Sequence, residues 1–270
     1  MFRQMRSAIR SVVLLLSLAL ALSRSVARAA PQQVRPPAPF SVDAKVALGA
    51  FVSLADAHLQ KMADTLRVLA ASDQARSADW KLIERPLAEL GKMNTPALNW
   101  FALKDGTYWS VQVGSETANL SDRPYFSKLL AGKVVLGDLV VSKATGKSTA
   151  IVAVPVRGPD GSVVGALGAS IYLDELSRRI RNQMGLGEGY IFFSFNEEPV
   201  LALVWDPTLI FSNPRELGPE VDRAFSEMLT RREGVVRYSF RQQPRTVFFR
   251  KSDVTGWWYG LGKVGPKAAP

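Results

Sequence analysis

Apolar positions between residues 42 and 71 recur in alternating steps of four and three, the spacing of one face of an α-helix. They are Leu48, Val52, Ala55, Leu59, Met62, Leu66 and Leu69. At 1.5 Å per residue, a helix over this segment is about 45 Å long. So narrow a stripe fits a helix packed along its own domain, and it also fits the seam of a parallel dimer. We favour packing and keep a homodimer through this helix as the alternative.

Further along the chain, short strand patterns alternate with tight turns. A second helix is predicted over residues 79–90. Hairpin turns are predicted at 104–107 and 158–161, because each holds an Asp-Gly pair that tolerates the positive φ of a tight turn. Helices are also expected at 123–131, 173–184 and 219–232. The predicted strands cover residues 100–103, 108–113, 148–156, 162–172, 190–195, 200–204, 235–240, 246–250 and 257–263.

Antiparallel sheets with intervening short helices, present twice, predict an α+β fold. We expect a long N-terminal helix followed by two similar PAS-like lobes. The expected boundaries are 41–75 for the long helix, 76–184 for the first lobe, 185–265 for the second lobe and 266–270 for a short tail.

Residues 1–30 have the pattern of a secretory signal peptide. Arg3, Arg6 and Arg10 precede an apolar run at 12–22, and a small-x-small cleavage site stands at 27–29. That run is roughly half of the 20 or so residues that cross a membrane. We therefore expect cleavage and a periplasmic or secreted protein, with an uncleaved inner-membrane anchor as the alternative. The proline-rich residues 31–40 are expected to form an extended linker.

Charge and composition narrow the possible partners. The chain has 34 Lys and Arg, 24 Asp and Glu, one His and no Cys. Cleavage would remove five arginines and leave a surplus of about five positive charges, which is typical of an ordinary solvated surface. No basic block interleaved with aromatic residues indicates a nucleic-acid partner. The absence of Cys and the single His exclude thiolate and His-cluster metal sites, and we expect no metal or cofactor.

We expect no enzymatic activity. His58 lies within the predicted long helix, where a polar or half-buried position explains it better than a role as catalytic base. No serine stands in a G-x-S-x-G elbow, and residues 146–149 match only the end of a phosphate-binding P-loop. Paired carboxylates carry no local signature, so a carboxylate-based hydrolase stays as the least favoured alternative.

Four elements stand in order in the first lobe: residues 121–126 (SDRPYF), 142–147 (SKATGK), 154–161 (VPVRGPDG) and 164–176 (VGALGASIYLDEL). Together they resemble the double Cache (dCache) family of extracytoplasmic sensor domains, over residues 100–180. In that family a long helix carries a membrane-distal and a membrane-proximal PAS-like lobe. The resemblance implies that the distal lobe binds a small metabolite and reports it to a membrane histidine kinase, a chemoreceptor or a cyclase.

Chemistry at the first of these elements supports a ligand site. Arg123 can bind a carboxylate through two parallel hydrogen bonds. Tyr125 and Phe126 would add an aromatic wall and a phenolic donor at the start of a short helix, which Ser121 and Asp122 are candidates to cap. Alternatively, the two aromatic residues are core residues and Arg123 pairs with a surface acid.

The chain departs from the amino-acid-binding members of the family at two positions. In those members, acidic residues before the Ala-Thr-Gly element and in the last element hold the ammonium group of the ligand. Ser142 and Ser170 stand there in this chain, so a buried ammonium would lack its counter-charges. We therefore predict a small organic acid without an amine. Its candidate contacts are Arg123, Tyr125, Phe126, Tyr108, Ser110, Ser142, Ser170 and Tyr172.

The resemblance thus implies an exported, non-enzymatic sensor module. Family members usually continue through a second membrane helix into a signalling domain, which this sequence does not show. We expect the module to act through a separate membrane protein. The alternative is a structural or interaction protein with a degenerate, empty pocket.

Overall fold

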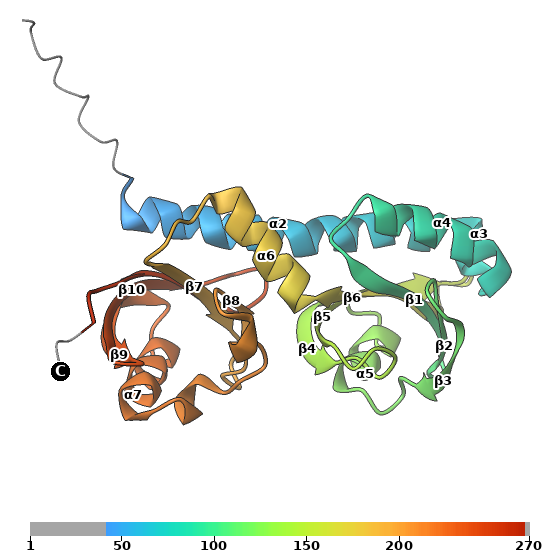
Figure 1. Cartoon of the computed structure of the whole chain (residues 1–270). Helices are drawn as coiled ribbons and strands as arrows, with labels where there is room; N and C mark the ends of the chain where they lie inside the picture. Colours follow the sequence, from blue (N-terminus) through green and yellow to red (C-terminus); the bar gives the residue numbers. More distant parts are fainter. Residues whose placement is uncertain (1–41, 268–270) are drawn as a thin grey trace, which may run out of the picture. The chain divides into compact units, whose positions relative to one another are not determined.

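A computed structural model describes residues 42–267. The predicted signal peptide, the predicted linker and the end of the predicted tail lie outside these residues. Long helix α2 (Ala44–Ala70) is followed by two antiparallel sheets with helices between them, which confirms the predicted α+β class (Figure 1). Across residues 42–267, none of the helices combines the length and hydrophobicity that a membrane span requires.

Helix α2 begins after Asp43, whose carboxylate accepts a hydrogen bond from the backbone N–H of Lys45 at 2.7 Å. This N-cap satisfies one of the otherwise free donors of the first turn. Every residue of the predicted apolar stripe is buried, in one hydrophobic core with residues of both sheets. The stripe is therefore used for packing within the chain, and a homodimer through this helix remains a prediction.

The first sheet has six strands in the order β3-β2-β1-β6-β5-β4, all antiparallel. Short helices α3 (Asp73–Arg76) and α4 (Trp80–Lys92) precede it. Its elements are β1 (Ala97–Leu103), β2 (Thr107–Ser110), β3 (Gly114–Asn119), α5 (Pro124–Leu130), β4 (Val135–Val141), β5 (Ser148–Arg157) and β6 (Val163–Tyr172). Both expected hairpins, β1–β2 and β5–β6, are present, whereas β3 and β4 were not predicted.

Helix α6 (Leu173–Met184) leads to the second sheet and covers the predicted range. The second sheet has the order β8-β7-β11-β10-β9. Its elements are β7 (Tyr190–Phe195), β8 (Leu201–Val204), the 3-10 turns η1 (Pro207–Leu209) and η2 (Pro214–Glu216), α7 (Pro219–Leu229), β9 (Glu233–Phe240), β10 (Gln243–Lys251) and β11 (Trp258–Val264). With β1 matched to β7, this order repeats the β2-β1-β6-β5-β4 part of the first sheet.

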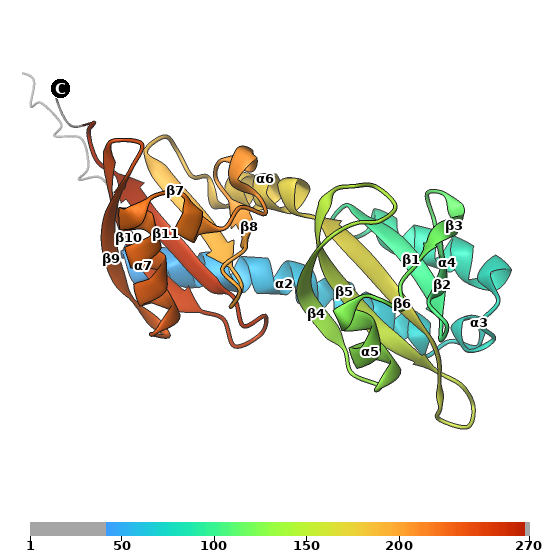
Figure 2. The same cartoon turned by 90° about the horizontal axis from the view of Figure 1, so that it is seen from below.

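Each sheet is covered on both faces. Because side chains alternate along a strand, Phe101 of β1 joins the core against α2, whereas Trp100 and Ala102 join a cluster on the opposite face with α5. The second sheet is arranged alike, with α7 over the face turned away from α2 (Figure 2). In each half of the fold, a cavity can therefore form between the strands of the sheet and the short helix that covers them.

Candidate functional site

A small cavity lies between the first sheet and α5, and we call it the first cavity. It encloses about 10 Å³. It is lined by Leu98, Trp100, Tyr108, Leu120, Arg123, Tyr125, Val140, Ser142, Lys143, Ile151 and Ser170. That volume holds about one water molecule. As it stands, the cavity is too small for an organic ligand.

Five of the eight predicted site residues line the first cavity: Tyr108, Arg123, Tyr125, Ser142 and Ser170. They come from β2, β6, the start of α5 and the β4–β5 turn, which are far apart in the sequence. The fold thus brings three of the four sequence elements of the resemblance, those at 121–126, 142–147 and 164–176, to one place together with Tyr108. Their role in binding a ligand stays a prediction.

The other three predicted residues lie elsewhere. Phe126 follows Tyr125 on α5, and the rotation of a helix by about 100° per residue turns it into the core. Ser110 is buried and donates a hydrogen bond to Glu116 Oε1. Tyr172 stands at the start of α6, and Lys147 Nζ lies 4.5 Å from its ring centroid.

Trp100 is the largest residue of the first cavity that sequence reasoning missed. It stands opposite Gly168 in the β1–β6 pairing, and a Cβ at position 168 would lie 2.1 Å from the Trp100 ring. Glycine therefore lets the indole lie flat against β6. The indole Nε1–H donates to Ser170 Oγ at 3.2 Å. A glycine inside a strand, away from any turn, is the signal that could have revealed this close approach.

The charged groups of the first cavity are all cationic. Arg123 and Lys143 line it, and none of its lining residues is Asp or Glu. Arg123 is half-buried, and its Nη2 donates to the carbonyl of Val141 at 2.8 Å. Arg123 has no ion-pair partner among the described residues, so an anion in this cavity would find a counter-charge in its guanidinium.

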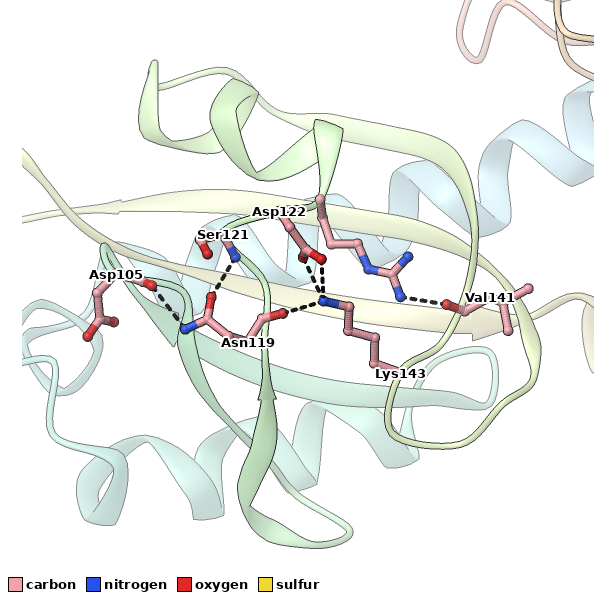
Figure 3. A network of polar contacts seen from close by, with 7 residues as sticks. Asp105, Asn119, Ser121, Asp122, Val141 and Lys143 are labelled. Carbon is pink, nitrogen blue, oxygen red and sulfur yellow. Dashed lines mark hydrogen bonds and ion pairs between the residues drawn. The ribbon is translucent and has the colours of Figure 1, made fainter.

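Lys143 joins the β4–β5 turn to the loop before α5. Its Nζ donates to Asp122 Oδ1 at 2.6 Å, to Asp122 Oδ2 at 2.8 Å and to the carbonyl of Asn119 at 2.8 Å (Figure 3). We call these three residues the latch. The hydrogen bond from Lys143 lowers the pKa of Asp122 below its ordinary value. The pair is exposed to solvent, so it adds little to stability.

The latch also explains why the expected caps of α5 are not used. The N-cap is Arg123, and no side chain caps the helix. Asp122 bonds to Lys143 instead, and the backbone N–H of Ser121 donates to Asn119 Oδ1 at 2.8 Å. The Asn119 amide donates in turn to the carbonyl of Asp105 at 3.0 Å, which ties the loop to the β1–β2 turn (Figure 3).

The two tyrosines of the first cavity are hydrogen-bond donors at neutral pH. Burial raises the pKa of Tyr108 to about 12, and it also raises the pKa of Tyr125. The positive charge of Arg123 offsets part of each shift. Both phenols therefore keep their protons, which an anion can accept in hydrogen bonds.

His58 occupies a structural position. It is half-buried on α2, with Nε2 2.9 Å from Gln183 Oε1 and Nδ1 3.0 Å from Thr95 Oγ1. Both ring nitrogens are thus engaged away from the first cavity. Throughout residues 42–267, no three His, Asp or Glu side chains come together in a way that could hold a metal ion.

Comparisons with known proteins identify the fold. No protein-family model matches the sequence, and no curated protein matches it. Solved structures do match. The ligand-binding domain of the Pseudomonas aeruginosa amino acid chemoreceptor PctB, in complex with L-Arg, has a TM-score of 0.63 at 16% identity, over 82% of this chain and 93% of that one. The sensor domain of the V. cholerae histidine kinase DctB has a TM-score of 0.62 at 16% identity, over 83% and 96%.

A third match is an extracellular ligand binding receptor from Desulfohalobium retbaense, with a TM-score of 0.65 at 16% identity. It covers 82% of this chain, which spans only 40% of the receptor. These neighbours are sensor domains of the double Cache type. The chain therefore has the double Cache fold, as the sequence resemblance predicted.

Proposed function

We propose that this chain is an exported, ligand-binding sensor module, and that its first cavity takes a small organic anion without an amine. One observation carries the proposal: Arg123 lines the cavity without an ion-pair partner among the described residues, and no carboxylate lines it. The second cation of the lining, Lys143, is already paired with Asp122. An anion would gain a charge partner there. An ammonium group would lose its hydration without gaining one, which is costly in a small enclosed site.

The remaining lining groups suit a carboxylate. Among the described residues the Arg123 side chain makes one hydrogen bond, through Nη2, so its other guanidinium N–H groups are available to a ligand. Tyr108 and Tyr125 offer phenolic protons, and Ser142 and Ser170 offer hydroxyls that are almost fully buried. A charge-assisted hydrogen bond to the guanidinium is the strongest of these contacts.

Binding in the proposed site requires the first cavity to open, since the cavity as it stands holds about one water molecule. The β4–β5 turn and the loop before α5 close over it, and the exposed latch joins them. A ligand can favour the rearranged state only by its difference in affinity for the two states. We propose that the turn moves away when the anion enters and then closes on it.

The proposed output passes through α2 to a separate membrane protein. Helix α2 packs against β5 and β6, which both carry residues of the first cavity. Neighbours in a chemoreceptor and in a histidine kinase support a partner of one of these two classes. The rival function is an interaction protein whose cavity stays empty.

Isothermal titration of the full chain tests the proposal, with acetate, lactate, succinate and malate as acids and alanine and serine as amino acids. We expect one of the acids to bind, and we expect Arg123→Met to lower the affinity for that acid at least tenfold. Arg223→Met is the matched control, because Arg223 also donates through Nη2 to a backbone carbonyl, that of Arg237, at 2.9 Å. Tight binding of an amino acid that Arg123→Met leaves unchanged contradicts the ligand class, and no binding at all favours the rival.

A second experiment tests the two serines. The substitutions Ser142→Asp and Ser170→Asp each introduce a carboxylate into the cavity. Each should weaken the binding of the organic acid, because the two negative charges repel, and strengthen the binding of an amino acid, because the carboxylate pairs with its ammonium group. Ser162→Asp, on the exposed β5–β6 turn, is the control. Equal affinities in all three variants would show that these serines do not set the charge of the ligand.

A further inference from the structure

An arginine is buried in the core of the second sheet. Arg245 lies on β10 at a core-facing position, in alternation with Val247 and Phe249, and only 5% of it is exposed. Its direct cross-strand neighbour on β9 is Tyr238. Arginine is almost never buried to this degree unless it is paired.

The guanidinium of Arg245 has no ion-pair partner among the described residues, and its polar neighbour is the Tyr238 phenol on the next strand. Its Nε and Nη1 are buried without a hydrogen-bond partner. It lies instead over two aromatic rings, 4.6 Å from the centroid of Trp205 and 4.7 Å from that of Phe240. Cation–π contacts stabilise the charge, but they do not satisfy N–H donors, whose burial without acceptors is unfavourable.

Asp206, a carboxylate of the same region, is bonded to groups other than Arg245. It accepts hydrogen bonds from the backbone N–H of Thr208 at 3.1 Å, from the Thr208 hydroxyl at 2.7 Å and from Arg241 Nη1 at 3.0 Å. Asp206 therefore pairs with Arg241 and not with Arg245. The charge of Arg245 is left without a counter-charge in an ion pair among the described residues.

Arg245 borders a cavity of about 10 Å³ between the second sheet and α7, which we call the second cavity. Arg245 is the only charged residue of its lining. The others are the aromatic residues Phe193, Trp205, Phe225, Tyr238 and Phe240 and the aliphatic residues Leu201, Leu209, Leu217 and Val221. One cation thus faces an apolar, mostly aromatic space.

The second cavity occupies the same place in its sheet as the first cavity does. One lies between the strands and α7, the other between the strands and α5. Phe193 on β7 stands opposite Gly260 on β11, as Trp100 stands opposite Gly168 in the matching strands of the first sheet. The two halves of the fold therefore present cavities in equivalent positions, with different linings.

We infer that the second cavity is a second ligand site, which takes a monocarboxylate with a flat aromatic body. The carboxylate would accept hydrogen bonds along an edge of the Arg245 guanidinium and supply the missing acceptors. The ring would pack among the aromatic side chains. A single cation and the scarcity of polar lining groups favour one anionic group on an apolar body, unlike the ligand proposed for the first cavity.

Entry of such a ligand requires the second cavity to expand. Leu209 and Leu217 line it from residues 207–218, which form two isolated 3-10 turns between β8 and α7. This segment covers the cavity without belonging to the sheet or to a long helix. It is the part of the wall that can move with the least disruption of the core.

Titration of the full chain with benzoate and phenylacetate tests the inference, with uncharged benzamide as the control ligand. We expect at least one acid to bind, and benzamide to bind at least tenfold more weakly. Arg245→Met, which keeps an unbranched apolar side chain in the core, should weaken the acid at least tenfold. Arg123→Met should leave its affinity within twofold.

Val221→Trp provides a second variant, because it fills the second cavity and leaves the guanidinium in place. It should lower the affinity for the aromatic acid as Arg245→Met does. The experiment therefore still decides the question if one of the two variants fails to fold. The inference is overturned if neither acid binds, or if binding survives in whichever of the two variants folds. Loss of binding in Arg123→Met alone also overturns it, and would place the aromatic acid in the first cavity.

Discussion

Asp56 is a buried carboxylate that joins α2 to the second sheet. It is 7% exposed. Its Oδ2 accepts a hydrogen bond from Ser252 Oγ at 2.7 Å, and its Oδ1 accepts one from the Tyr259 hydroxyl at 3.3 Å. Burial is the largest influence on the pKa of Asp56 and raises it, although these hydrogen bonds lower it in part. The contribution of this side chain to stability therefore falls as the pH rises, the opposite of a carboxylate whose pKa is lowered by folding.

A raised pKa means that the folded state holds this proton more tightly than the unfolded chain, in which an Asp has a pKa of about 3.9. The contribution of Asp56 to stability is therefore fully present below about pH 4 and is lost as the pH rises to the folded-state pKa. Each pKa unit of difference corresponds to about 1.4 kcal/mol. Exposed carboxylates with lowered pKa, such as Asp160 and Asp222, act in the opposite direction.

The substitution Asp56→Asn isolates this effect, because it removes the charge and keeps an acceptor. We expect the unfolding free energy of the original chain, minus that of Asp56→Asn, to fall as the pH rises from about 4 and then to level off. Asp56→Ala should cost roughly 2–6 kcal/mol at pH 7, since two buried hydroxyls lose their acceptor at about 1–3 kcal/mol each.

Urea denaturation followed by circular dichroism, at intervals from pH 3.5 to pH 7, measures these differences. Asp64→Asn is the control, because Asp64 lies on the same helix with 68% of its side chain exposed. It measures the effect of removing an exposed carboxylate from α2. Parallel profiles for the original chain and Asp56→Asn would refute the reasoning, because they would mean that Asp56 titrates alike in both states.

Two further predictions concern the first cavity. Gly168→Ala would place a Cβ 2.1 Å from the opposite indole, so it should cost about 1–3 kcal/mol by overpacking and should abolish ligand binding there. Gly260→Ala is the control, because its Cβ would lie 2.3 Å from the opposite ring in the second sheet. It should lose similar stability but keep ligand binding in the first cavity. Equal ligand binding in the two variants would contradict the prediction. Lys143→Met should return the pKa of Asp122 toward its ordinary value in an NMR titration and speed hydrogen exchange in the β4–β5 turn, with little change in melting temperature. Unchanged exchange would show that the latch does not hold the turn.

Hydrophobic periodicity predicted every helix longer than four residues and most strands, but it missed two strands of the first sheet. Strand β3 is a polar edge strand, GSETAN, with no fully buried residue, so no apolar alternation marks it. Strand β4 is interrupted at Gly137, which has a φ of 95°, and its pairing with β5 shifts between Leu136 and Asp138. A bulge of this kind breaks the period of two on which strand prediction depends.

The sequence predicted much of the first cavity but not the second cavity. Arg123, Ser142 and Ser170 stand in elements of the resemblance, so the sequence order indicated that they belong together. Trp100 joins them only through the register of β1 against β6, which depends on long-range pairing. Arg245 was missed because the predicted strand began at residue 246, whereas β10 begins at Gln243 and turns Arg245 inward.

The hydrophobic core around α2 also determines how the chain unfolds. It contains residues from both sheets, among them Phe101 and Leu167 of the first and Phe192 and Tyr259 of the second. Neither sheet can melt without exposing apolar surface that the other half of the molecule shares. Residues 42–267 should therefore behave as one cooperative unit, with a single calorimetric transition whose enthalpy equals its van't Hoff enthalpy.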